Sequence, residues 1–184
     1  MKISRKFVAV TMAVMLGLGA ASSFAKVMVG GAPMLASKDI IDNAVNSKDH
    51  TTLVAAVKAA GLVDTLKGPG PFTVFAPTNA AFDALPAGTV DTLLKPENKA
   101  MLAGILTYHV VAGKMDSKAL IKAIKKGKGS AELKTVAGGT LTAKTAGGKI
   151  MLMDEKGGTS TVTIANVYQS IGVIHVVDKV LLPK

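Results

Sequence analysis

The hydrophobic pattern changes from helical spacing to strand-like alternation about two-thirds of the way along the chain. After Asp39 the apolar residues first recur at helical spacing. The apolar residues from Thr51 to Ala60 have the same helical spacing, and Gly61 follows at the position where a glycine commonly ends a helix. Serine, threonine and asparagine side chains that can cap helices precede several of the later runs. The pattern predicts helices over 39–45, 51–60, 62–66, 80–82, 89–94, 98–106 and 117–126.

Strand formers bounded by proline or glycine mark the other elements. Three Gly-Gly pairs begin at Gly138, Gly147 and Gly157, at intervals of nine and ten residues. Because glycine supplies the positive φ of tight hairpin turns, the pairs predict an antiparallel meander of four strands over 131–136, 140–145, 149–154 and 160–165. Further strands are predicted over 72–76, 108–111 and 172–177. Helices first and strands last is the order of an α+β protein.

The first 25 residues have the form of a secretory leader. A basic start (Lys2, Arg5, Lys6) precedes an apolar run over 7–21, and Ser23-Phe24-Ala25 offers a cleavage site before Lys26. At about 15 residues the run is shorter than the roughly 20 that span a bilayer. We therefore expect a signal peptide over 1–25, an extended arm over 26–36 and one domain over 37–184. The mature protein is expected in the periplasm or outside the cell, and not as an integral membrane protein.

Composition excludes several kinds of site. The chain has no cysteine, which rules out disulfides, thiolate metal sites and a cysteine nucleophile. Its 22 Lys and Arg residues against 12 Asp and Glu give +10, which becomes +7 without the leader. The single arginine, Arg5, lies in the leader, so the mature chain lacks the bidentate base contacts typical of nucleic-acid readers. We expect no nucleic-acid partner.

Three segments together resemble the fasciclin (FAS1) domain family: 73–82 (TVFAPTNAAF), 106–111 (LTYHVV) and 172–183 (GVIHVVDKVLLP). They occur in family order and spacing over nearly all of the mature chain. The resemblance implies a β-sandwich or wedge with helices packed around it, and a non-enzymatic role in cell adhesion or extracellular interaction. It also leaves open a carrier for an apolar small molecule, because some members bind carotenoids. The Asp-Ile pair of many adhesive members is replaced by Asn166-Val167, which argues against integrin-type recognition.

The candidate structural or interaction residues lie in these motifs: Thr78, Asn79, Tyr108, His109 and His175. If 108–111 is a strand, Tyr108 and His109 point to opposite faces. A buried His109 needs a hydrogen-bond partner, expected to be Thr78 or Asn79. His175 is expected at the edge of the core, and His50 as a cap or surface residue of the helix after it. No spacing suggests a metal site, a cofactor site or a catalytic constellation.

The densest charge lies over 118–128, where Lys118, Lys122 and Lys125 align on one helical face and Lys126 and Lys128 extend it. Such a run is commonly a solvated helix face. Its functional alternative is docking onto an anionic polysaccharide, a phospholipid surface or an acidic protein.

Overall fold

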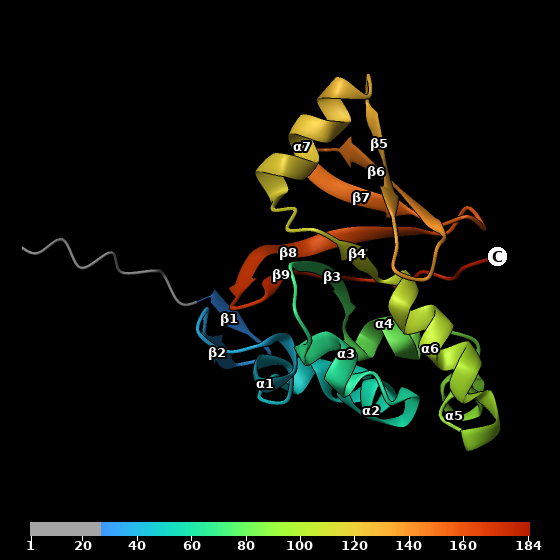
Figure 1. Cartoon of the computed structure of the whole chain (residues 1–184). Coiled ribbons are helices and arrows are strands. Elements are labelled where there is room, and N and C mark those ends of the chain that lie inside the picture. Colours follow the sequence, from blue (N-terminus) through green and yellow to red (C-terminus); the bar gives the residue numbers. More distant parts are fainter. Residues whose placement is uncertain (1–26) are drawn as a thin grey trace, which may run out of the picture.

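The computed structural model describes residues 27–184, so the predicted signal peptide lies outside the described residues. Six helices gather on one side of the central strands, and the seventh lies on the opposite side, beside the meander (Figure 1). The helices are α1 (Ile40–Ala44), α2 (Thr51–Ala60), α3 (Val63–Lys67), α4 (Asn79–Asp83), α5 (Thr89–Leu93), α6 (Lys99–Tyr108) and α7 (Ser117–Lys126), with 3-10 turns η1 (Lys48–His50) and η2 (Pro96–Asn98).

A seven-stranded mixed sheet has the order β4-β3-β9-β8-β7-β6-β5. Its strands are β3 (Phe72–Pro77), β4 (Val110–Ala112), β5 (Ser130–Lys134), β6 (Thr140–Ala146), β7 (Lys149–Met153), β8 (Thr159–Gln169) and β9 (Gly172–Val177). An isolated bridge between Val111 and Thr135 nearly closes the sheet on itself. Strands β5 to β8 form the predicted antiparallel meander. The α+β fold class is confirmed.

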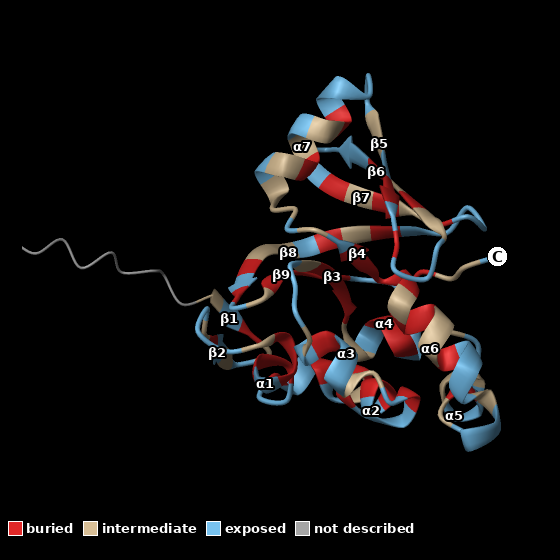
Figure 2. Cartoon of the chain, in the orientation of Figure 1, coloured by how far each residue is buried: buried red, intermediate tan, exposed pale blue. Residues whose placement is uncertain are grey.

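Strands β3 and β9 run parallel at the centre and divide the interior into two cores. Val74 and Ile174 point into the core beneath α1 to α6, whereas Phe75 and Val177 point into the core beneath α7. All six residues of β9 are buried, as Figure 2 shows for the central strands. A strand covered on both faces has no solvent side, which explains the continuous apolar sequence of this segment.

The segment predicted as an extended arm is extended, but it folds into a hairpin of β1 (Val27–Val29) and β2 (Ala32–Met34). Gly30 and Gly31 both have positive φ and make its turn. Val29 and Met34 are buried in the larger core, and the Gly30 carbonyl accepts a hydrogen bond from the Lys48 amide at 3.2 Å. The hairpin is therefore packed onto the domain body.

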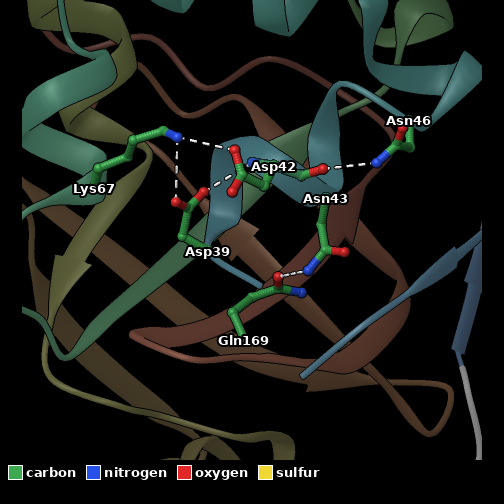
Figure 3. A network of polar contacts seen from close by, with 6 residues as sticks. All are labelled: Asp39, Asp42, Asn43, Asn46, Lys67 and Gln169. Atoms are coloured by element: carbon green, nitrogen blue, oxygen red, sulfur yellow. Dashed lines mark hydrogen bonds and ion pairs between the residues drawn. The ribbon is translucent and has the colours of Figure 1, made fainter. Parts of the chain in front are cut away.

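A polar network holds α1 against α3 and β8 (Figure 3). Lys67 Nζ lies 3.4 Å from Asp39 Oδ2 and 2.9 Å from Asp42 Oδ1. On the buried side, the Asn43 side-chain amide donates to Gln169 Oε1. Asn43 is 1% exposed and Gln169 3%. Asn43 Oδ1 accepts from the Leu35 amide and Gln169 Nε2 donates to the Val167 carbonyl, so the buried polar atoms of both side chains have partners.

The predicted strand over 108–111 is wrong at its start. Helix α6 continues to Tyr108, His109 follows in helical conformation, and β4 begins at Val110. The His109 amide donates to the Leu106 carbonyl at 3.1 Å, which extends the helical hydrogen bonding into the motif. The composition of the motif favours a strand, but tertiary packing overrides a local preference of this size.

Candidate functional site

Tyr108 is a structural residue of the smaller core. It is completely buried, and its hydroxyl donates to the Thr140 carbonyl at 2.8 Å and accepts from the Glu155 amide at 3.2 Å. Burial raises the pKa of this phenol. The ring and its two hydrogen bonds join the end of α6 to the start of β6 and to the turn after β7, which leaves no surface for a partner.

His109 is equally enclosed, but its predicted partners are wrong. Its Nδ1 lies 2.8 Å from the Ile105 carbonyl oxygen, and its Nε2 accepts from the Leu181 amide at 2.9 Å. Burial lowers its pKa to about 4, so the imidazole is neutral at physiological pH. Thr78 and Asn79 are not its partners, because they are occupied elsewhere.

Thr78 and Asn79 organise the helix ends beside β3. Thr78 Oγ1 caps α4 by accepting from the Ala81 amide at 3.3 Å. Asn79 Oδ1 accepts from the Thr52 amide at 3.0 Å, and its Nδ2 donates to the Lys48 carbonyl at 2.8 Å. Both side chains therefore connect elements of the domain.

His175 and His50 are both more buried than the sequence suggested. His175 is 0% exposed; its Nε2 lies 2.8 Å from the Met115 carbonyl, and its ring stacks on Phe75 at 5.6 Å between centroids. His50 is 3% exposed; its Nδ1 lies 2.9 Å from Ser47 Oγ, and its Nε2 has no partner among the described residues. Burial lowers the pKa of both imidazoles. Nothing in the sequence around His50 indicated its burial.

His50 lines an apolar cavity of about 20 Å³ between the hairpin, α1 and the sheet. A neighbouring apolar cavity of about 30 Å³ lies between α1, α2 and His109. Spaces of this size hold one or two waters, whereas pockets for small organic ligands commonly reach about 300 Å³ or more. Within residues 27–184 no group of three His, Asp or Glu side chains is placed to hold a metal ion.

The five lysines singled out by the sequence form an exposed surface on and just after α7, which we call the lysine face: Lys118, Lys122, Lys125, Lys126 and Lys128. Figure 2 shows the exposed outer side of α7, and its buried Leu120 and Ile124 face the sheet. Among residues 27–184 no carboxylate lies within 4 Å of these ammonium groups, because the ion pairs found there belong to Lys67.

The lysine face belongs to a strongly basic part of the molecule. Residues 114–156, which we call the basic lobe, contain ten lysines and four Asp or Glu residues, a net charge of +6. The other residues of 27–184 contain eight lysines and eight Asp or Glu residues, a net charge of zero. The basic lobe comprises α7, β5, β6 and β7, the upper part of Figure 1. All the formal net charge of the described chain is therefore in one lobe.

Two polar side chains hold the first turn of α7 in place. Asp116 caps the helix, its Oδ1 accepting from the Ala119 amide at 2.8 Å. Asn166 reaches across from β8: its Oδ1 accepts from the Ser117 amide and its Nδ2 donates to Ser117 Oγ, both at 2.7 Å. Val167, beside it, is 1% exposed. The pair that replaces the adhesive Asp-Ile is thus engaged in the fold.

We expect Asn166→Ala to destabilise the protein by about 2 kcal/mol, because it removes two hydrogen bonds and places alanine at φ +61°. Asn166→Gly removes the same bonds but accepts that φ, so it should cost about 1 kcal/mol less. Urea unfolding monitored by circular dichroism measures both. Equal losses in the two variants would show that the left-handed backbone contributes nothing.

Comparison with known proteins gives consistent results. A model of the fasciclin domain matches residues 48–183. Protein sll1483 of Synechocystis sp. is 51% identical over 144 residues, covering 78% of this chain and 73% of that protein. The cell surface glycolipoprotein MPB83 of Mycobacterium bovis is 47% identical over 89 residues, covering 46% of this chain and 39% of that protein. The FAS1 domain pair of the insect cell adhesion molecule Fasciclin I superposes with a TM-score of 0.70 at 18% identity, covering 79% of this chain and 51% of that chain.

Proposed function

Because the chain belongs to the fasciclin family, we propose that it is an exported, non-enzymatic adhesion or interaction module that acts through the basic lobe. Its relatives include a protein named for the cell surface, and one of its fold neighbours is a cell adhesion molecule. None of the helices within residues 27–184 is long and apolar enough to cross a membrane. The leader predicted at residues 1–25 supports release of the mature chain into the periplasm or the medium.

The observation that carries this proposal is the separation of charge. A net charge of +6 lies in residues 114–156 and none in the rest of the described chain. An accumulation of like charge on one lobe raises the local concentration of anionic partners and steers their approach. Lysines without a carboxylate partner within 4 Å can meet the anionic groups of a partner without first breaking an internal ion pair.

The burial of the three histidines supports a non-enzymatic role. The imidazoles of His50, His109 and His175 are each at most 3% exposed, and those of His109 and His175 are held by backbone groups. A general base must lie within hydrogen-bond reach of its substrate, and these rings are enclosed by the core instead.

A carrier of an apolar small molecule is the second candidate, favoured by the unpartnered Nε2 of His50 beside an apolar cavity. The cavity beside His50 offers about 20 Å³, so an isoprenoid-sized ligand could enter it only if the hairpin or α1 moved away. Native mass spectrometry of protein purified from its own host separates the two candidates: a bound lipophilic mass favours the carrier.

The interaction proposal is tested by neutralising the lysine face. We expect Lys118→Gln/Lys122→Gln/Lys125→Gln to reduce binding of the mature protein to host cell envelopes about tenfold or more, because it removes half of the lobe's net charge. The matched control, Lys38→Gln/Lys58→Gln/Lys95→Gln, removes the same charge from exposed positions outside the lobe and should bind as the wild type does. Sedimentation of labelled protein with envelopes at low and high salt provides the measurement. An equal loss in both triple variants would contradict a role for this surface.

A further inference from the structure

An exposed aromatic ring stands beside the lysine face. Tyr168, near the end of β8, is 40% exposed, and the ammonium group of Lys114 lies 5.2 Å from its ring centroid. Its hydroxyl donates to Asp116 Oδ2 at 3.2 Å, which places the ring at the first turn of α7. A cation above a tyrosine ring at this distance is an attractive arrangement. Charge and apolar surface therefore meet at one end of the lysine face.

The lysines continue from this ring along α7. Lys118 is one turn from Lys122 and two turns from Lys125, so the row extends about 10 Å at 1.5 Å per residue. Asp116 is the acidic group at the start of this row. Its carboxylate is bound by the Ala119 amide at the helix N-terminus, and this hydrogen bond lowers its pKa. The remaining side chains of the row present ammonium groups to solvent.

These features favour one class of anionic partner over the others. A membrane-binding surface needs apolar side chains among its cations. Of the large exposed aliphatic residues within 27–184, Met28, Val45 and Met101 lie outside the basic lobe, and Val136, the one inside it, follows β5 and is not on α7. Nucleic-acid surfaces that bind single strands use several stacking aromatics, whereas Tyr168 is the one exposed aromatic side chain among residues 27–184. An acidic polysaccharide offers both repeated negative charge and the apolar C–H faces of its sugar rings.

We infer that the basic lobe binds an acidic polysaccharide, with one sugar ring packed against Tyr168 and successive acid groups paired with Lys114 and the lysine face. The inference rests on the proposed interaction function and names its partner. A phenol ring offers rigid, amphipathic contact area at little cost in conformational entropy, which suits it to this position. The ring would provide selectivity for sugar over other anionic polymers. The lysines would provide most of the electrostatic attraction, which salt weakens.

The experiment compares polygalacturonate with neutral dextran, poly-L-glutamate and phosphatidylglycerol vesicles by titration calorimetry and vesicle sedimentation. We expect wild-type protein to bind polygalacturonate more tightly than poly-L-glutamate of the same length, and to leave dextran and vesicles unbound at 150 mM salt. Tyr168→Ala should weaken polygalacturonate binding about fivefold and leave poly-L-glutamate binding unchanged, because stacking is lost while charge is kept. Tyr168→Phe keeps the ring and should retain wild-type affinity. Thermal unfolding of each variant checks that it is folded.

Lys114→Gln provides a second test at an exposed side chain, should Tyr168→Ala disturb β8. It should weaken polygalacturonate binding several-fold. The same is expected of Lys118→Gln/Lys122→Gln/Lys125→Gln on α7. Equal affinity of wild type for polygalacturonate and poly-L-glutamate, or tighter binding to vesicles, would overturn the polysaccharide assignment. Failure of the polysaccharide assignment is distinguishable from failure of the proposed function. If Lys118→Gln/Lys122→Gln/Lys125→Gln loses envelope binding but polygalacturonate does not compete with the wild type, the interaction surface stands and its partner is not a polysaccharide.

Discussion

Replacing Gly172 with alanine is expected to destabilise the protein by about 3 kcal/mol, because the added methyl group would push two paired strands apart. Gly172 begins β9 and pairs in parallel register with Phe72 of β3. A β-carbon at this position would overlap the carbonyl oxygen of Phe72 and lie 2.9 Å from its carbonyl carbon. Both atoms are backbone of a central strand, so relief requires the two strands to separate.

Gly104→Ala is the matched control. Gly104 lies inside α6, and a β-carbon there would meet nothing within 4 Å. Because alanine restricts the unfolded chain and favours helix, this variant should be more stable than the wild type by about 0.5–1 kcal/mol. Urea unfolding of both variants, followed by circular dichroism, gives the two free energies. A loss below about 1 kcal/mol for Gly172→Ala would mean that β3 and β9 yield more easily than their packing implies.

Local signals account for the parts of the fold that sequence could predict. The helix over Thr51–Ala60 ends at Gly61, which has φ +71° as its position requires, and the Gly-Gly pairs produce the turns of the meander. In both cases the residues that determine the structure are neighbours in the chain. The same holds for α7, whose alternation of lysine with leucine and isoleucine indicated its exposed and buried sides.

Pairings between distant residues could not be predicted in the same way. The parallel contact of β3 with β9 joins segments about one hundred residues apart, and no local pattern specifies a partner at that separation. His109 illustrates the consequence. Its need for a hydrogen bond was evident, but its acceptor Ile105 lies one helical turn away and its donor Leu181 seventy-two residues away. The sequence indicated the need and not the partners.

The candidate site shows the same division. The lysine face was predicted, because charge spacing on one helix is local information. Tyr168 and Lys114 were missed, since their contact depends on how β8 meets the first turn of α7. The strand period alone does not place Tyr168 outward, because its neighbour Gln169 is polar and yet is 3% exposed in the fold.

Acidification from pH 6.5 to pH 4 is expected to remove about 3 kcal/mol of stability through His109 alone. Burial lowers the pKa of this imidazole from 6.5 to about 4 in the folded protein. Between these values the unfolded chain binds a proton at His109 that the folded chain does not. Lowering the pH therefore favours unfolding, and the contribution is fully present only above about pH 6.5. His50 and His175 act in the same direction, because burial lowers the pKa of each.

His109→Asn isolates this contribution, because an amide can donate to the Ile105 carbonyl and does not titrate. The variant should lose about 1–3 kcal/mol at pH 7, since the Leu181 amide is left without its acceptor. Its stability should then fall less steeply than that of the wild type between pH 6 and pH 4.5, by about 1 kcal/mol per pH unit. Urea titrations at several pH values measure both slopes, and carboxylate effects cancel in the comparison. Equal slopes of stability against pH in the two proteins would mean that His109 has the same pKa in the folded and the unfolded chain. Its hydrogen bonds to Ile105 and Leu181 would then not hold the ring in its neutral form.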